Sequence, residues 1–132
     1  MNLQVKQVAF GIGQTQILQG IDLDVQDREI VGLIGPNGSG KSTLLKCMYR
    51  TLHPNAGQIM LNGRALDELS FRESALQMAV VAQHNQYQFD FSVMDIILMG
   101  RMPHKKLLEG DSPEDYTIAR RALAQVGMDH ME

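Results

Sequence analysis

Hydrophobic and polar residues alternate along positions 3–25 of the chain. The alternation is imperfect at 3–10 and more regular at 17–25, where hydrophobic side chains share one face and Asp22 and Asp24 occupy the other. A period of two is typical of a strand with one buried face. The segment between the two runs, Gly-Ile-Gly-Gln, has the composition of a turn. The pattern therefore predicts an antiparallel hairpin with one face toward solvent.

The pattern changes at positions 29–34, a short and nearly continuous apolar run that leads into a glycine. Such a run is typical of a strand covered on both faces, as in a parallel sheet. Positions 42–50 then predict a helix, which the Pro- and Gly-containing segment 53–57 ends. One side of this helix is apolar and carries Leu44, Leu45 and Met48.

The rest of the chain predicts two more strands and three more helices. The strands are expected at 58–63, which ends in an Asn-Gly turn, and at 78–82, a second short apolar run. The helices are expected at about 70–77, 93–99 and 113–126, and each has a serine that can cap its start. Proline and two acidic residues follow Ser112, and they support the prediction that the last helix begins there.

Strands, a glycine-rich loop, a helix and then further strands and helices indicate an α/β fold with an antiparallel N-terminal part. The length of 132 residues fits one domain. A parallel sheet needs several strands, and the pattern shows no second half of a doubly wound sheet. We therefore expect the sequence to be truncated relative to a complete domain.

The charge composition limits the kinds of partner. The net charge is −3, from 12 basic and 15 acidic side chains. This balance gives no global attraction for nucleic acid or anionic lipid, so no nucleic-acid partner is expected. Any anion that the protein binds must be held by a local site.

Cysteine usage and hydropathy indicate the compartment. Cys47 is the single cysteine, so no disulfide can form within the chain, and a reducing compartment is the simpler interpretation. The N-terminus lacks the apolar run of a signal peptide, and no apolar stretch approaches the roughly 18 residues that span a bilayer. We expect a soluble, cytoplasmic chain, and this expectation is compatible with docking on a membrane protein.

The segment 35–42 matches the pattern G-x-x-x-x-G-K-[ST] in full, between a predicted strand and a predicted helix. A triphosphate carries several charges, and the backbone N–H groups of 37–43 can form one concave nest for them. Glycines at 38 and 40 let the backbone approach the phosphate oxygens closely, and the N-terminus of the helix adds its dipole. The alternative is a glycine-rich turn that happens to precede a lysine, and the flanking elements argue against it.

The residue types in this loop indicate ATP with Mg²⁺ as the ligand. Lys41 supplies a mobile cation for the β- and γ-phosphates, and it is the first catalytic candidate. The Ser42 hydroxyl can ligate Mg²⁺, a hard ion that prefers oxygen. Thr43 is placed for the α-phosphate. The expected ligand contacts in the loop are therefore Asn37, Gly38, Ser39, Gly40, Lys41, Ser42 and Thr43.

The sequence Gly-Pro-Asn-Gly-Ser-Gly-Lys-Ser-Thr at 35–43 resembles the P-loop of the ATP-binding subunits of ABC transporters. Phe10-Gly11 followed by Ile17-Leu18, the segments 54–59 and 61–63, and Val80 to Gln83 are also similar to that family. The resemblance implies that Phe10 stacks on adenine. It further implies that Gln83 is the Q-loop glutamine, which contacts Mg²⁺ and helps to position the attacking water.

The resemblance implies a fold and an organisation. The fold would be an α/β P-loop NTPase (RecA-like) core with an antiparallel N-terminal β-subdomain and the start of a helical subdomain. The β-subdomain and core would occupy about 1–85, and the Q-loop and helical part about 86–132. Gly-Arg-Met-Pro-His at 100–104 resembles the importer branch for iron–siderophore, haem and cobalamin complexes. The alternative for that segment is a basic surface loop after a helix.

The resemblance also implies partners, namely a second ATP-binding subunit in a homodimer and a transmembrane permease, which would hold this chain at the inner face of the cell membrane. Nothing in the chain matches Leu-Ser-Gly-Gly, an apolar strand followed by Asp-Glu, or a switch histidine. We therefore expect poor ATP binding and negligible hydrolysis by this polypeptide alone. Two alternatives are a small kinase or GTPase, and a catalytically inactive nucleotide-binding fragment or broken-gene product.

Overall fold

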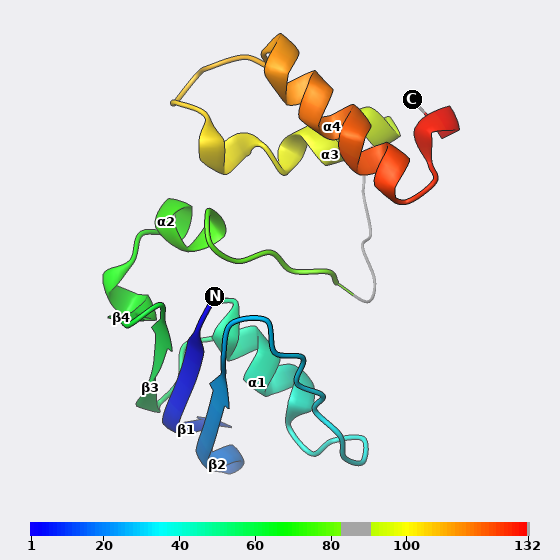
Figure 1. Ribbon diagram of the computed structural model, residues 1–132. Helices are drawn as coiled ribbons and strands as arrows, with labels where there is room; N and C mark the ends of the chain where they lie inside the picture. The colour runs from blue at the N-terminus through cyan, green and yellow to red at the C-terminus, as the bar shows by residue number, and fades with distance from the viewer. Residues whose placement is uncertain (83–90, 132) are drawn as a thin grey trace. The chain divides into compact units, whose positions relative to one another are not determined.

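The computed structural model describes residues 1–82 and 91–131. The chain divides into two compact units, Met1–Val80 and Val81–Glu132. In Figure 1 the first unit runs from blue to green, and the second continues to red.

The first unit is built on a four-stranded antiparallel sheet with the order β2-β1-β3-β4. Strands β1 (Leu3–Ile12) and β2 (Thr15–Val25) form the hairpin that the alternation predicts. Strand β3 (Ala56–Leu61) pairs with the other edge of β1, and the short β4 (Arg64–Ala65) pairs with β3. Strand β1 therefore lies inside the sheet, with a hydrogen-bonded neighbour on each edge.

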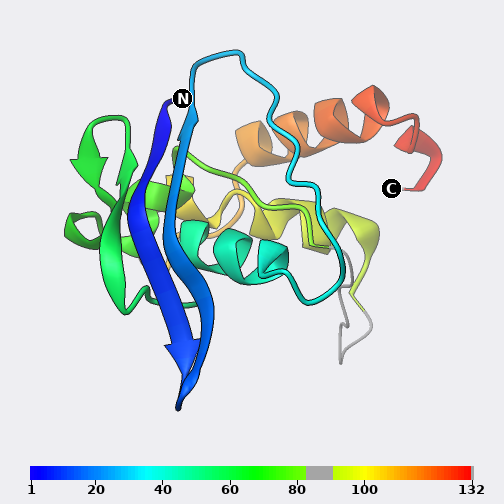
Figure 2. The same ribbon diagram turned by 90° about the horizontal axis from the view of Figure 1, so that it is seen from below.

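Helix α1 (Lys41–Met48) lies against one face of this sheet (Figure 2). Its buried residues are Leu44, Cys47 and Met48. The opposing sheet residues of the same core are Leu3, Val5, Val8, Phe10, Leu18, Ile59 and Leu61. Burial of a large apolar side chain contributes about 1.5–3 kcal/mol, so this contact fixes α1, and with it the glycine-rich loop that precedes it.

A close backbone approach joins β1 to the start of β3. Gly57 has a φ of 83°, and a Cβ at this position would lie 2.2 Å from the carbonyl oxygen of Gln7. Gln7 is itself in the left-handed region, with a φ of 49°, where the β1–β3 register shifts. Only glycine tolerates both the conformation and the contact.

The strands predicted at 29–34 and 78–82 are wrong for this structure, because neither segment forms a strand. Ile30, Ile34 and Val81 are 98–99% exposed. A strand is held by ladder hydrogen bonds to a neighbour, and an apolar run intended for burial on both faces needs covering layers as well. Among residues 1–82 and 91–131, no strand pairs with either segment.

The first unit ends with a short 3₁₀ turn, Leu66–Glu68, and helix α2 (Phe71–Ala75). The second unit contains α3 (Val93–Met99), a 3₁₀ turn at Met102–His104, α4 (Pro113–Gln125) and a last 3₁₀ turn at Asp129–Met131. Its buried hydrophobic residues are Leu98, Ala119 and Leu123. In the described part of the chain, no helix is long and apolar enough to cross a membrane.

The predicted helix starts at Ser70, Ser92 and Ser112 are confirmed. Each of these serines caps its helix, and the acid three residues later completes a capping box. In each box the serine oxygen accepts the N–H of the acid, and the carboxylate accepts the N–H of the serine. The chain itself therefore satisfies two of the free amides at each of these helix starts.

Candidate functional site: the loop before helix α1

The predicted phosphate-binding loop lies between the exposed Ile34 and the first residue of α1. The Ser39 N–H donates to the Pro36 carbonyl at 3.3 Å, which closes a turn. Gly38 and Gly40 have φ values of 82° and 90°, so both glycines use the left-handed conformation for which the motif needs them. Asn37, Gly38 and Ser39 are exposed.

Gly40 joins the loop closely to β2. A Cβ at this position would lie 2.8 Å from Leu18 Cδ2 and 3.2 Å from the carbonyl oxygen of Ile17. The backbone of Gly40 therefore packs against β2 at a place where the Cβ of any other residue would clash. This contact places the start of α1 directly against the sheet.

The start of α1 differs from the other helix starts in its chemistry. Gly40 is the N-cap, so no side chain caps the helix, and the first turn holds no acidic residue. The Leu44 N–H donates to the Gly40 carbonyl at 2.8 Å, as the first hydrogen bond of the helical series. The amides of Lys41, Ser42 and Thr43 precede that bond and have no acceptor within the helix. These amides and the positive end of the helix dipole are suited to an anion.

The Lys41 ammonium is folded back over the loop. Its Nζ donates to the carbonyl oxygens of Gly35 and Pro36, each at 2.7 Å, and to Ser39 Oγ at 3.3 Å. These neutral oxygens hold the cation next to the amides of the loop. Phosphate oxygens form stronger, charge-assisted bonds with an ammonium group and could replace them.

Two hydroxyl groups stand in the first turn of α1. Ser42 is exposed and Thr43 is half-buried. Within residues 1–82 and 91–131, neither side chain makes a hydrogen bond. The Ser42 oxygen is therefore free to act as a ligand.

The donor set can be tested against Mg²⁺. No group of three or more His, Cys, Asp or Glu residues could hold a metal ion in the described part of the chain. Mg²⁺ bound to a nucleotide does not require such a group, because phosphate oxygens and water supply most of its ligands. One free hydroxyl fits that arrangement. Gln83, the second predicted Mg²⁺ ligand and catalytic candidate, lies outside the described residues.

An open pocket of about 350 Å³ lies beside the loop. Its hydrophobic lining residues are Leu18, Ile21, Leu33, Ile34 and Leu44, and Ser39 and Lys41 also contribute. A polyphosphate needs donors rather than carbon atoms around it. The apolar side of this pocket is therefore not the place for the phosphates, which the amides of Lys41, Ser42 and Thr43 suit better.

Phe10 has a different position from the one that adenine stacking needs. The ring belongs to the hydrophobic core of the first unit, is 7% exposed, and lies on β1 across from Leu18. In this structure it offers no free face to a base. Stacking of Phe10 on adenine stays a prediction, and it would require the ring to leave the core.

Sequence reasoning did not find the partners of Lys41. The carbonyl groups of Gly35 and Pro36 hold the ammonium, and no side-chain signal marks a backbone oxygen. It also did not predict Arg50, whose guanidinium lies 4.2 Å from the centre of the Phe71 ring. No spacing rule connects these two residues.

Comparison with known proteins gives concordant matches. The sequence model of the family described as "ABC transporter" matches residues 18–132. A hemin import ATP-binding protein of Gloeobacter violaceus is 39% identical over 115 residues, which are 87% of this chain and 41% of that protein. An iron(3+)-hydroxamate import ATP-binding protein of Bacillus subtilis is 34% identical over 127 residues, covering 96% of this chain and 46% of the relative.

A solved structure gives the same result. An inward-facing conformation of a metal-chelate type ABC transporter superposes with a TM-score of 0.73 at 26% identity, covering 98% of this chain and 46% of that one. The chain thus spans about half the length of the relatives that it matches. The matches include the loop at 35–43 and continue through the second unit.

Proposed function

This chain belongs to the ABC transporter family, and we propose that its loop at 35–43 binds the triphosphate of ATP together with Mg²⁺. Membership of this family implies nucleotide binding, and it removes the support for a small kinase or GTPase. The expected fold class, a P-loop ATPase fold with an antiparallel N-terminal sheet, is confirmed by the same matches. The relatives are import ATP-binding proteins.

One observation carries the proposal, namely the uncapped start of α1. The amides of Lys41, Ser42 and Thr43 stand at the positive end of the helix with no acid in the first turn. The Lys41 ammonium is held in the same loop by the carbonyl oxygens of Gly35 and Pro36. Uncompensated donors and a nearby cation are the features by which a helix N-terminus binds phosphate.

The residues of the loop would have separate roles. The amides of Lys41, Ser42 and Thr43 would donate to the phosphate oxygens, and Lys41 would move its three donors from loop oxygens to the β- and γ-phosphates. The Ser42 hydroxyl would ligate Mg²⁺, which, when bound, neutralises phosphate charge and orients the terminal phosphate. Gln83 would supply a second oxygen to the metal and help to position water.

The loop at 35–43 accounts for nucleotide binding, and turnover needs further groups. Phosphoryl transfer depends on groups that position water and stabilise charge on the terminal phosphate. The chain contains no Leu-Ser-Gly-Gly segment and no apolar strand that ends in Asp-Glu after Gln83. A catalytically inactive nucleotide-binding fragment, or the product of a broken gene, therefore remains the alternative for this polypeptide taken alone.

The parent activity that fits the relatives is ATP-driven import of an iron complex, haem or cobalamin. The proposed assembly is a homodimer of ATP-binding subunits bound to a permease at the inner face of the membrane. A groove of about 520 Å³ in the second unit is the proposed permease contact, since its lining is partly apolar, with Phe91, Leu98, Met99 and Met102 beside Asp95, Lys105, Glu109 and Asp111. Co-purification of the full chain with the permease tests this partner.

Calorimetry with Mg-ATP tests the binding site directly. Lys41→Ala removes the cation of the loop, and we expect a loss of affinity on the order of tenfold to a hundredfold, since a hydrogen bond to a charged group contributes about 1.5–3 kcal/mol. Lys46→Ala is the matched control, because Lys46 is an exposed lysine of the same helix outside the motif. Equal affinities for all three proteins would refute the assignment.

A further inference from the structure

Helix α1 ends in a conformation that its sequence does not favour. The chain turns away from the helix at Arg50, which has a φ of 66°. The Arg50 N–H donates to the Cys47 carbonyl, and the amides of the next two residues donate to the Lys46 carbonyl. Glycine is the usual residue at a left-handed helix end, because it has no Cβ to strain. An arginine at this position suggests that its side chain has a use.

The side chain of Arg50 reaches α2. Its guanidinium lies over the Phe71 ring, 4.2 Å from the ring centre, and Nη1 donates to Ser74 Oγ at 3.1 Å. Ser74 is buried, and its hydroxyl also donates to the Phe71 carbonyl at 3.0 Å. Helix α2 has only five residues, so it depends on contacts from outside the helix for its stability.

The contact also carries a cost. The Arg50 Nε is buried and has no hydrogen-bond partner among residues 1–82 and 91–131. Arg50 also lines a small cavity of about 30 Å³, together with Cys47, Leu66 and Asp67. A buried donor without a partner disfavours the folded state. The strained backbone and the unsatisfied nitrogen both argue that the link between α1 and α2 has a role beyond packing.

We propose that Arg50 is a positioning residue that transmits nucleotide binding from α1 to α2. This inference rests on the proposed nucleotide site at the other end of α1. Helix α1 has eight residues and is about 12 Å long, so a phosphate that orders its N-terminal end also restrains its C-terminal end. Arg50 carries that restraint to Phe71 and Ser74. Beyond α2 the chain continues to Gln83, the predicted contact of Mg²⁺.

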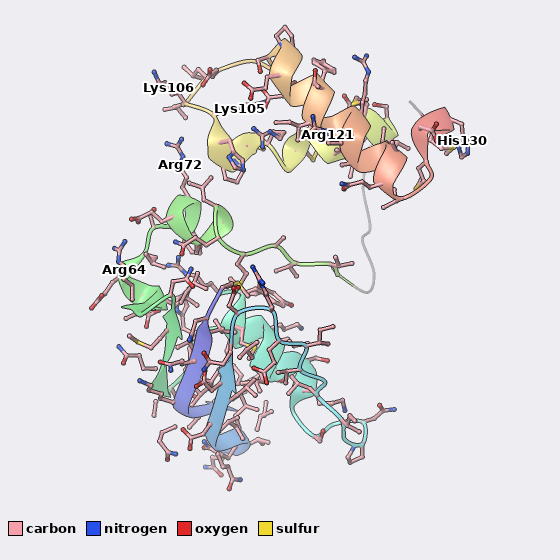
Figure 3. The ribbon with its side chains drawn as sticks, viewed as in Figure 1. Arg64, Arg72, Lys105, Lys106, Arg121 and His130 are labelled. Carbon is pink, nitrogen blue, oxygen red and sulfur yellow. The ribbon has the colours of Figure 1, made fainter. Side chains whose placement is uncertain are left out.

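Arg64 offers a matched comparison, because it also holds α2. Its Nη1 lies 3.2 Å from a carboxylate oxygen of Glu73. Arg64 comes from β4 rather than from α1, and Figure 3 labels its side chain. If α2 needs only to be tethered, loss of either arginine should have the same effect. If the restraint travels along α1, only loss of Arg50 should block it.

Hydrogen exchange of the full chain, with and without Mg-ATP, tests the inference. In the wild type we expect nucleotide to slow exchange both at 35–43 and at 70–80.

Arg50→Lys keeps the charge but loses the planar guanidinium group. It should bind Mg-ATP within about twofold of wild type, keep the protection at 35–43 and lose that at 70–80. Arg50→Gly relieves the left-handed backbone and should give the same result. Arg64→Lys should keep both protected segments.

The outcomes separate the inference from the function on which it rests. Protection at 35–43 without protection at 70–80 in the wild type would overturn the role of Arg50 and leave nucleotide binding intact. Retained protection at 70–80 in both Arg50 variants would overturn it as well, as would the same loss in Arg64→Lys. If Mg-ATP neither binds nor protects 35–43 in the wild type, the proposed nucleotide site itself fails.

Discussion

Helices α1 and α4 begin in opposite ways. Helix α4 starts with Ser112 as its cap, and Asp115 accepts the Ser112 N–H at 3.0 Å and the Ser112 hydroxyl at 2.7 Å. Arg101 Nε donates to the same carboxylate at 2.9 Å. Helix α1 starts with Gly40, has no acid in its first turn and adds the cation of Lys41. The chain compensates one helix start with its own groups and leaves the other start open.

The difference shows how a binding site is distinguished from an ordinary helix start. Caps and acids near an N-terminus each contribute some tenths of a kcal/mol to about 1 kcal/mol or somewhat more. Helix α1 lacks this stabilisation by a side-chain cap and an acidic residue, whereas α2, α3 and α4 all have it. The packing of Leu44, Cys47 and Met48 on the sheet stabilises α1 instead. The free amides then remain available for an external anion.

Giving α1 the start of α4 should produce the largest effect. Thr43→Asp places an acid three residues after the N-cap, the same position that Asp115 has in α4. We expect Mg-ATP binding to fall by more than about tenfold through charge repulsion, while the helix gains about 0.5 kcal/mol from its dipole. Calorimetry and thermal melting measure the two effects. Thr43→Asn is the neutral control and should lose far less affinity; unchanged binding by the aspartate variant would show that the phosphates lie elsewhere.

Removing the compensation at α4 should produce the next largest effect. Asp115 is 6% exposed, and its loss would leave the Arg101 guanidinium without its carboxylate, whereas Lys105 would keep Asp111. We expect Asp115→Asn to lower the melting temperature of the second unit by roughly 5–10 °C. Glu114→Gln in the same turn is the control and should change it little. Equal melting of both variants would mean that the network around Asp115 contributes nothing.

Acid should act on α4 through the same carboxylate. The hydrogen bond from Arg101, followed by those from the Ser112 N–H and hydroxyl, holds the pKa of Asp115 well below its ordinary value. A group whose folded pKa is lowered stabilises the fold above its unfolded pKa, about 3.9, and that stability is lost as pH falls toward the folded pKa. Exchange of the α4 amides should therefore accelerate relative to α1 below about pH 4, and Asp115→Asn should remove that dependence. An unchanged ratio in the wild type would contradict the effect.

Local patterns predicted the features of the fold that local interactions determine. Alternation gave the β1–β2 hairpin, and Ser-x-x-acid spacing gave the starts of α2, α3 and α4, because a capping box is closed within four residues. The loop at 35–43 was also recognisable, since its glycines are needed where φ is positive. These features depend on neighbours in the sequence.

The features that depend on distant neighbours were not predicted. The runs at 29–34 and 78–82 have the composition of buried strands, yet a strand requires a partner, and the described residues provide none. The core position of Phe10 also depends on tertiary packing, and its stacking on adenine stays a prediction. The contact of Arg50 with Phe71 joins two helix ends that are 21 positions apart, and no periodicity marks it.

Amide chemical shifts during a titration with Mg-ATP test the central claim most directly. In the full ¹⁵N-labelled chain, we expect the largest and saturable shifts at Gly38, Gly40, Lys41, Ser42 and Thr43. The amides at the start of α4 should not move, because Ser112 and Asp115 already satisfy them. Shifts that spread equally over both helix starts, or that are absent from the loop at saturating nucleotide, would contradict the account.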